Sequence, residues 1–472
     1  MNVTTNYWEI LNRACNTGVE TRVRDFDMKI FALASRLVKE YEIKYDPTVY
    51  VPSDDSLADD VWKAGLELFL DLGVYCVNTR RVIKFTESEV KEALKTVCDK
   101  VEIGTGGEKR LVTRRGIDGS KPPVIVGGVI ESDILEGESY VKLYQSIAQE
   151  PLIDGLYVGP PVHTSEGHTL RKGSPLEIHL GRCMAMWARE AITRAGRPGL
   201  HLVSACPSAI ADIAACNPES GIRRSDGLMI SLIAEMKTDY EALGKTTYAL
   251  DYGCIKATHG GSVIGGWGGG PEGAAVVSIA DFLSAMMVYH HKIGPTYGDH
   301  GLTRCPGAVP ISSINPGMWG TELTGQAIAR NYRGVNGRFF LTAAGPGTEM
   351  QLWEVAALCI AGLASGRDLF CGGGIRRYKV RSMLGSALEN KFHAELGHAA
   401  TGIKRDDANE IVAGIVQRYE KNVTSDGGPW GYSFGEIYDT RTLEPKQEYR
   451  ELYDKMRHEM RELGFDLDNV TC

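Results

Sequence analysis

Two kinds of hydrophobic pattern alternate along the chain, one with the spacing of helices and one made of short continuous runs. Apolar residues recur at helical spacing over 25–43 and 60–72, and an apolar run at 74–77 fits a strand. Thr86 and Glu89 form a capping-box pattern ahead of a third helix, because each side chain can accept the other's backbone amide. Residues 1–120 are therefore predicted to form an N-terminal helical extension.

From residue 122 onward, short apolar runs end in glycine or proline and alternate with helical segments. Strands of a parallel barrel are buried on both faces, so they read as continuous apolar runs. A doubly wound open sheet is the main alternative, but the number of runs and the glycines at their ends favour a closed (β/α)8 TIM barrel of the α/β class. The eight runs cover residues 124–126, 156–158, 200–203, 246–250, 262–264, 308–314, 339–342 and 369–371.

The last part of the chain returns to helical spacing. Residues 406–419 and 447–463 combine good helix formers with apolar spacing, and a glycine-rich break separates them. We therefore expect a barrel core over 121–385 and C-terminal helices packed on it over 386–472.

Composition and charge narrow the class of protein. Hydrophobic residues make up 43% and charged residues 24% of the chain, which is typical of a soluble globular protein. The net charge is −8 without a long basic run, so nucleic acid is not an expected partner. No apolar stretch reaches about 18 residues and the start lacks a signal-peptide pattern, so neither a membrane nor export is expected. The 11 cysteines form no Cys-x-x-Cys pair, which indicates reduced thiols in a cytoplasmic protein.

In barrels of this kind, reactive residues come from the C-terminal ends of the strands. His259, Glu349 and Asp251 follow predicted strands, and we predict that they are catalytic. His259 lies in a polar loop, which favours an accessible imidazole. Glu349 is suited to a general acid or an orienting carboxylate, but it can equally cap the helix that follows.

Glycine-rich strand exits form a second group of candidates. Their backbone amides could cradle a phosphate, but no complete dinucleotide or P-loop motif is present, which favours close packing or a flat cofactor. Metal ligation by cysteine and histidine is also conceivable, but no ligand spacing is recognised and no metal is predicted. The candidate cofactor-binding residues are Gly265, Gly266, Gly345, Gly347, Gly372 and Gly373.

Several stretches in order along the chain carry a family likeness, among them Gly-Arg-Pro-Gly at 196–199 and Ala-Gly-Pro-Gly-Thr-Glu-Met at 344–350. With them, the chain resembles the monomethylamine:corrinoid methyltransferases over nearly its whole length. The other stretches are 63–65, 71–76, 104–106, 364–367, 419–422 and the tail from 438.

The resemblance implies a TIM barrel that forms a homo-oligomer, a hexamer in that family, and passes a methyl group from an amine-type donor to cobalt. The chain lacks an Asp-x-His-x-x-Gly stretch, and none of its histidines has Asp two residues earlier. No tightly bound cofactor is therefore expected, and the corrinoid (cobalamin) should arrive on a cognate corrinoid protein.

One departure from the family changes the expected donor. The resemblance places the family's pyrrolysine at or beside Val203, and it places two pocket glutamates at Met229 and His259. Valine has no donor, acceptor or electrophilic carbon, so it cannot activate methylamine as pyrrolysine is thought to do. We therefore hypothesise a pyrrolysine-free methyltransferase for a small methylated donor with its own activation, most simply a quaternary ammonium.

In this hypothesis the substrate-binding residues are Val203, Met229 and three further side chains. Tyr252 and Trp267 would hold the cation with their ring faces, although core packing is the alternative for each, and Arg338 would bind a substrate carboxylate. Two alternatives remain open. Zinc at Cys254 and His259 could assist demethylation of an ether or thiol, or the chain could be a catalytically inactive binding protein.

Overall fold

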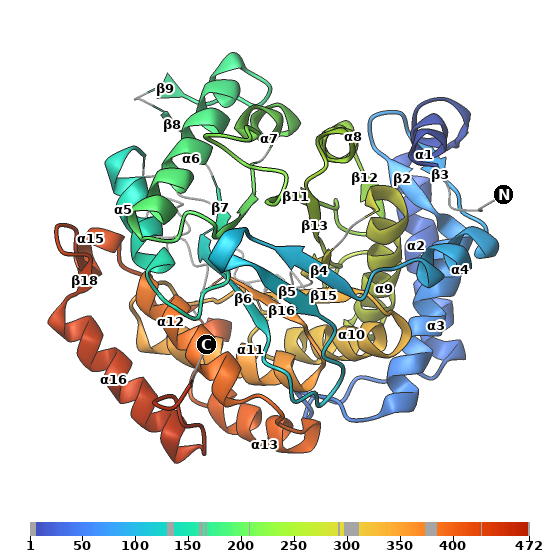
Figure 1. The fold of residues 1–472 in the computed structure, drawn as a ribbon. Helices are drawn as coiled ribbons and strands as arrows, with labels where there is room; N and C mark the ends of the chain where they lie inside the picture. The colour runs from blue at the N-terminus through green and yellow to red at the C-terminus, as the bar shows by residue number, and fades with distance from the viewer. Residues whose placement is uncertain are drawn as a thin grey trace.

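Eight parallel strands close into a barrel at the centre of the computed structural model (Figure 1). The structure describes residues 6–129, 136–159, 164–165, 168–206, 208–290, 293–296, 311–372, 385–425 and 427–470. The predicted TIM barrel is confirmed. In barrel order the strands are β6 (Val124–Val129), β7 (Gly155–Val158), β10 (His201–Ser204), β11 (Gly227–Ser231), β13 (Ile255–His259), β14 (Ile293–Thr296), β15 (Val335–Phe339) and β16 (Leu369–Cys371).

Three of the eight predicted strands are wrong, although the number is right. Residues 246–250 belong to helix α8 (Tyr240–Tyr252), which Asp239 begins by accepting the amide of Ala242 at 2.8 Å. Residues 262–264 follow β13, and 311–314 form turns, while 308–310 lie outside the described residues. The true strands β11, β13 and β14 contain glycine, lysine, threonine, serine or proline, so their apolar runs are interrupted. The predicted strand at 339–342 overlaps the observed strand β15 only at Phe339.

At the N-terminal end of the barrel, aspartate side chains make the same hydrogen bond repeatedly. In each case an aspartate directly precedes one strand, and its carboxylate accepts a backbone amide near the start of the neighbouring strand. The bond uses an amide that would otherwise be buried without a partner, and it ties the two strands in register. The pairs are Asp154 with Ile125 (3.0 Å), Asp226 with Leu202 (3.1 Å) and Asp368 with Asn336 (2.8 Å).

Helices surround the barrel in Figure 1 and cover its outer face. One of them, α9 (Pro271–Tyr289), is long and apolar enough to cross a membrane, but 94% of its apolar window is buried inside the protein. It is therefore a core helix, packed between the barrel and the N-terminal extension. The other covering helices are α5 (Glu138–Ala148), α6 (Pro175–Arg194), α7 (Ala209–Ala215), α8, α10 (Gly317–Asn331) and α11 (Glu349–Ala364).

The N-terminal extension contains the predicted helices and also short strands that the pattern did not reveal. Strands β1 (Val19–Glu20), β3 (Arg81–Ile83) and β2 (Val74–Cys76) form a sheet whose fourth strand, β12 (Lys237–Thr238), comes from the barrel region. The capping box of Thr86 and Glu89 is present. The helices are α1 (Tyr7–Asn12), α2 (Val23–Glu40), α3 (Asp55–Leu72) and α4 (Glu87–Lys95), with a π-helical turn at Arg13–Thr17.

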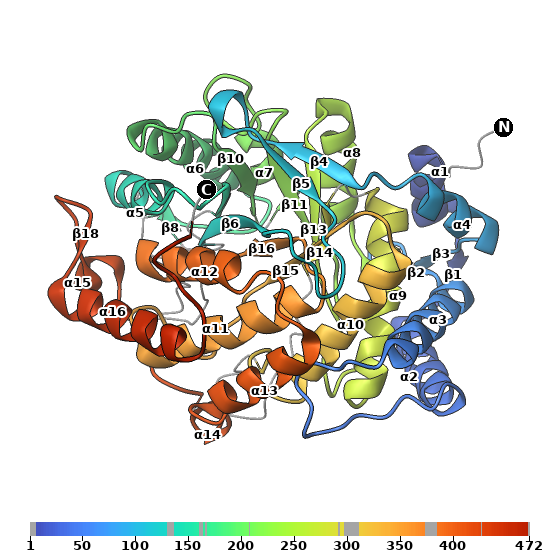
Figure 2. The same cartoon turned by 60° about the horizontal axis from the view of Figure 1, so that its bottom comes forward.

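A hairpin of β4 (Lys100–Ile103) and β5 (Arg110–Thr113) lies across the barrel (Figure 2). Val101, Ile103 and Val112 from this hairpin are buried in the same cluster as the inward-facing side chains of the barrel. The hairpin therefore covers the N-terminal end of the barrel. A 3-10 turn at Gly106–Glu108 joins its two strands.

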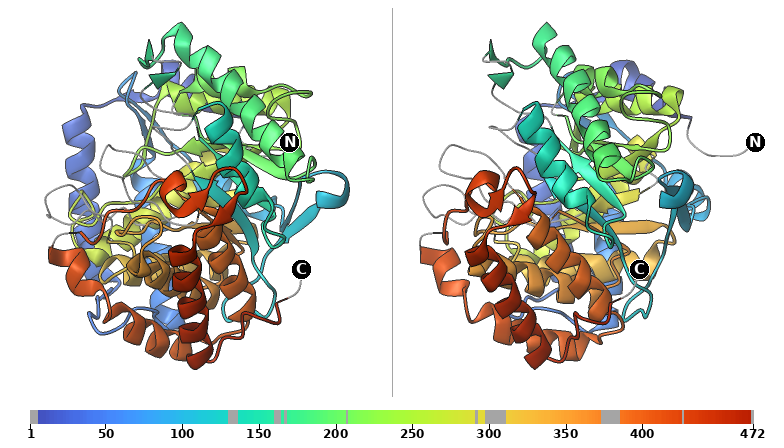
Figure 3. Two further views of the ribbon diagram at one scale, coloured as in Figure 1. Left: turned by 90° about the vertical axis from the view of Figure 1, so that its left-hand side faces the viewer. Right: turned by 60° about the vertical axis from the view of Figure 1, so that its left-hand side comes forward.

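The C-terminal helices pack together on one side of the barrel, below the green helices of residues 138–215 (Figure 3). Helices α13 (Arg405–Val416) and α16 (Gln447–Glu462) confirm the predicted helices, and α12 (Ala387–Ala399) precedes them. The domain boundaries at residues 120 and 385 stay a prediction. The remaining short elements are β8 (Thr164–Ser165), β9 (His168–Thr169), α14 (Glu420–Ser425), α15 (Phe434–Ile437), β17 (Tyr438–Asp439) and β18 (Glu444–Pro445).

Replacing Asp226 should destabilise the fold strongly. Asp226 pairs with the buried Arg189 guanidinium and also accepts the amides of Leu202 and Arg223. Asp226→Ala should therefore lower the free energy of unfolding by about 3–5 kcal/mol, because it leaves a buried charge without a partner. Urea denaturation followed by circular dichroism measures this. Asp251→Ala, an exposed aspartate on α8, is the matched control and should change stability by less than about 0.5 kcal/mol. Equal effects of the two variants would contradict the role of Asp226.

Candidate active site

The inward-facing side chains of the barrel form an apolar and aromatic cluster. Side chains of alternate strand residues face inward, and Val203, Met229, Tyr157, Phe339 and Cys371 are buried there in one cluster. Val203 is 2% exposed, and its neighbours across the ladder are Tyr157 and Gly227. The position expected for the family's reactive residue therefore faces the lumen.

Three rings meet in this part of the lumen. The rings of Tyr157 and Phe339 are 5.5 Å apart and nearly perpendicular, and the imidazole of His259 meets the same Phe339 ring edge-on at 5.4 Å. Burial raises the pKa of the Cys371 thiol, although a hydrogen bond with Tyr157 opposes the shift. Cys371 is therefore a neutral thiol and forms part of an uncharged wall. His259 ends β13 and is only partly buried, so it stands nearer to solvent than the other two rings.

Sequence reasoning missed Tyr157 as a lumen residue, and it considered Phe339 or Phe340 as a ring for a cation without choosing between them. These rings belong to apolar runs that were predicted as strands, at 156–158 and 339–342. The available signal was the alternation of facing along a strand, which places every second residue inside a barrel. The pattern alone did not say which of the two sets faces inward.

Polar groups of the outer helices hold the loops that leave the strands. Asp212 of α7 accepts from the Ser204 hydroxyl at 2.5 Å and the Cys206 amide at 3.3 Å, and Lys245 balances its charge at 2.7 Å. Glu354 of α11 accepts the amides of Ala343 and Ala344 at 2.7 and 2.8 Å. These loop amides are buried, so the carboxylates replace the water that would otherwise solvate them.

Asp281 of α9 holds the loop after β11 in the same way. Its carboxylate accepts the amides of Met236 at 2.5 Å and Glu235 at 3.4 Å, and both of these residues have left-handed backbone conformations with φ of 63° and 66°. Consecutive amides in such a turn converge on one acceptor group, here the Asp281 carboxyl. Glu235 in turn accepts the amide of Trp267 at 2.7 Å, which links the loops after β11 and β13. Burial raises the pKa of Asp281 to about 8.

The predicted positions of Asp251 and Tyr252 are wrong. Both residues end α8, and β13 begins only at Ile255, so they lie at the N-terminal end of the barrel. Asp251 is exposed, and the Tyr252 hydroxyl donates to the carbonyl of Ile222 at 2.9 Å. Their predicted roles rested on a strand exit that does not exist.

Trp267 and Arg338 also point away from the lumen. Trp267 packs against the hydrophobic cluster of the N-terminal extension, which was the alternative considered for it. Arg338 lies on β15 between the inward-facing Gly337 and Phe339, so its side chain faces the outer helices, where it pairs with the buried Glu322 of α10. A substrate in the lumen therefore has no access to this guanidinium.

Glu349 begins α11 and contacts the C-terminal helices. Its carboxylate accepts from Lys455 at 2.7 Å, and this bond lowers the pKa of Glu349. The helix is capped by the Thr348 hydroxyl, so Glu349 supports the first helical turn, as the second interpretation held. A carboxylate with a lowered pKa is a poor general acid.

Most of the candidate glycines are used for packing within the protein. The amides of Gly265 and Gly266 donate to Gly269 and Val263 inside their own loop. At Gly345 an added Cβ would lie 2.1 Å from the amide nitrogen of Gly431, so two loops pack backbone to backbone there. The Gly347 backbone turns at φ 77°, where an added Cβ would meet Tyr432 and Ile437.

Gly372 is different, because it borders the lumen. An added Cβ would lie 3.1 Å from the Phe339 ring, so the glycine gives this ring its space. Gly373 lies outside the described residues.

Cys254 and His259 cannot share a zinc ion. Cys254 directly precedes β13 and His259 ends it, which separates them by about 16 Å at about 3.3 Å per residue. Zinc ligands lie about 2 Å from the metal, so this pair is excluded. Among the described residues, no group of three or more histidine, cysteine, aspartate or glutamate side chains could hold a metal ion.

Comparison with known proteins assigns the chain to a family. The family model "Monomethylamine methyltransferase MtmB" matches residues 5–465. The chain belongs to this family. Among curated members, monomethylamine methyltransferase MtmB2 of Methanosarcina acetivorans is 29% identical over 468 residues, and MtmB of Methanosarcina mazei is 29% identical over 464 residues. Each alignment covers 97% of both chains.

Solved structures of the monomethylamine methyltransferase family share the whole fold. The crystal structure of the Methanosarcina barkeri enzyme superposes with a TM-score of 0.87 at 25% sequence identity, covering 98% of this chain and 99% of that one. A hydroxylamine complex of MtmB gives the same values. Because the match includes the N-terminal extension and the C-terminal helices, both parts belong to the family architecture.

The buried Asp281 should make stability depend on pH. Its pKa is raised in the folded state, so its contribution to stability is fully present below about pH 4 and is lost as pH rises to about 8. Between pH 6 and pH 9, Asp281→Asn should therefore lose less stability than the unchanged protein. Thermal unfolding at several pH values measures this difference. Parallel curves for the two proteins would contradict a raised pKa at Asp281.

Proposed function

We propose that this chain transfers a methyl group from a quaternary ammonium donor to a corrinoid held by a separate partner protein, and that it does so without pyrrolysine. Membership of the monomethylamine methyltransferase family supports the reaction class. The observation that carries the choice of donor is the apolar and aromatic lumen around Val203.

Val203 offers no group that could activate an amine. Its side chain contacts apolar neighbours, and Met229 and His259 stand where the family resemblance implies two glutamates. Among the described strand residues that alternate inward with Val203, none is aspartate or glutamate. The lumen is therefore unsuited to charging a neutral amine, and it suits a donor whose nitrogen is already cationic.

Donor charge matters because of the leaving group. The partner's corrinoid would supply Co(I) as the nucleophile toward the methyl carbon. As the bond to the methyl carbon breaks, the nitrogen of a quaternary ammonium keeps the electron pair and leaves as a neutral tertiary amine. Monomethylamine would have to leave as ammonia after protonation, or as a far more basic amide anion. The quaternary donor needs no such activation.

The three rings supply the binding energy for such a cation. Tyr157, Phe339 and His259 present aromatic surface at centroid separations of 5.4–5.5 Å. A cation over a ring gains about 0.5–2 kcal/mol, and more of this is retained when water is excluded. The Met229 thioether adds a polarisable contact. These residues replace Tyr252, Trp267 and Arg338, which the fold places elsewhere.

A panel of methyl donors should separate the possible substrates. The purified protein, incubated with cob(I)alamin as acceptor, should demethylate tetramethylammonium, choline or glycine betaine faster than monomethylamine. The absorbance change of the cobalamin measures methyl transfer. Turnover of monomethylamine and of no other donor would contradict the proposed donor class. Absence of turnover with every donor would instead favour a catalytically inactive binding protein.

Removing one ring should weaken use of a quaternary donor. Phe339→Leu keeps an apolar side chain but loses the ring face, so kcat/KM for the preferred quaternary donor should fall about tenfold, since about 1.4 kcal/mol corresponds to a factor of ten. Tyr252→Phe, at the other end of the barrel, is the matched control and should keep the original kcat/KM. An unchanged value in Phe339→Leu would show that this ring does not hold the donor.

A further inference from the structure

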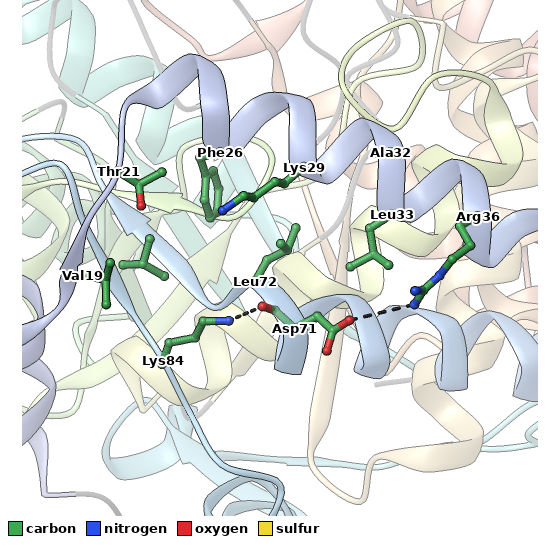
Figure 4. Close-up of a pocket in the computed structure, with 11 residues that line it drawn as sticks. Val19, Thr21, Phe26, Lys29, Ala32, Leu33, Arg36, Asp71, Leu72 and Lys84 are labelled. Atoms are coloured by element: carbon green, nitrogen blue, oxygen red, sulfur yellow. Dashed lines mark hydrogen bonds and ion pairs between the residues drawn. The ribbon is translucent and has the colours of Figure 1, made fainter.

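A surface groove lies apart from the lumen, between α2, the end of α3 and strands β1 and β3. It encloses about 570 Å³, which is within the usual range of about 300–1,000 Å³ for small-molecule pockets. Figure 4 shows side chains from both helices and both strands turned toward this space. None of the residues discussed for methyl transfer lines it.

The groove has an apolar floor. Phe26, Leu72 and Val82 are buried beneath it, and Leu33 adds to one wall. Val19 at the edge is 70% exposed, which is unusual for a large aliphatic side chain. An exposed concave apolar surface of this kind is a common feature of ligand sites.

Positive charge gathers around this floor, although the chain as a whole carries −8. Lys29, Lys84 and Arg36 line the groove with a single carboxylate, Asp71. Arg36 is already paired with Glu67 at 2.7 Å and lies 3.9 Å from Asp71. Lys84 donates to the backbone carbonyl of Asp71, as Figure 4 shows. Lys29 has no ion pair with any residue in the described ranges.

The Lys29 ammonium also disfavours the charge of Lys84. Partial desolvation lowers the pKa of Lys84, Asp71 opposes the shift, and the nearby Lys29 ammonium lowers it further. An anion placed between the two ammonium groups would relieve this repulsion. An adjoining hollow of about 610 Å³ shares Val19 and Lys29 with the groove. It adds Arg22 and Arg80 but also Glu20 and Asp25, and Arg22 pairs with Asp25 at 3.4 Å, so the excess of positive charge belongs to the groove itself.

We propose that this groove binds a small anionic amphiphile, with its acidic head between Lys29 and Lys84 and its apolar body on Phe26, Leu72 and Val82. The head is a carboxylate or a phosphate, because both suit a pair of lysines. The body is an alkyl chain or a ring, because the floor offers contact without hydrogen-bonding groups. The proposal does not depend on the methyl donor.

Calorimetric titration with octanoate, octyl phosphate, octan-1-ol and acetate tests the two halves of the ligand. Octanoate or octyl phosphate should bind saturably, and the stronger of the two identifies the head group. Octan-1-ol, which lacks the charge, and acetate, which lacks the chain, should each bind at least about tenfold more weakly. Failure of both anionic amphiphiles to bind at millimolar concentration would overturn the proposal, as would equal binding of octan-1-ol.

Charge-removing variants locate the site. Lys29→Gln should weaken octanoate about three- to fivefold, as expected for one exposed ion pair, and the double variant with Lys84→Gln should weaken it about tenfold or more. Lys39→Gln on the same helix lies outside the groove and serves as the matched control. Lys29 is exposed, so its variant should keep the circular dichroism of the parent. Equal weakening by Lys39→Gln would indicate only diffuse charge attraction and would overturn the assignment.

Discussion

The barrel depends on carboxylates that satisfy buried backbone amides at both of its ends. At the N-terminal end of the barrel, Asp154, Asp226 and Asp368 each accept a hydrogen bond from an amide of a neighbouring strand. At the C-terminal end of the barrel, Asp212, Asp281 and Glu354 accept hydrogen bonds from backbone amides of the loops that follow the strands. A strand end in a closed barrel has no further ladder partner, so without these groups its amides would be buried and unpaired.

This arrangement separates stability from chemistry. The carboxylates that hold the loops come from outer helices and are engaged by backbone amides. The lumen itself is walled by rings, a thioether and aliphatic side chains. In the proposed function, a cation would meet ring faces among the described residues, and this favours a donor that brings a permanent charge over one that must be ionised inside the protein.

The fold class could be predicted from the sequence because eight strand-and-helix units leave a repeated signature, but the place of each strand could not. Continuous apolar runs located β6, β7, β10 and β16. The pattern failed where a strand carries polar residues, as in β13, and where a covering helix carries an apolar run, as in α8. A better signal was present, since Asp-Gly-Leu occurs at both 154–156 and 226–228 and marks the starts of β7 and β11.

The candidate site was predicted only in part. Val203, Met229 and His259 line the lumen. Asp251 and Tyr252 do not, because the strand predicted just before them is part of helix α8. Arg338 shows a different limit: its strand was nearly right, but one residue of alternation decides between the lumen and the outer helices. Only the three-dimensional arrangement shows that Arg338 pairs with Glu322 on the outer side of the barrel.

Strand β12 ties the beginning of the chain to its middle. Its residues pair with β2, and Lys237 bonds Asp27 of α2 at 2.7 Å, so the small N-terminal sheet is complete only with a segment made about 160 residues later. During synthesis on the ribosome, the edge of β2 therefore stays unpaired until that segment has been made. A truncated chain that ends before β12 would present this open sheet edge to its neighbours.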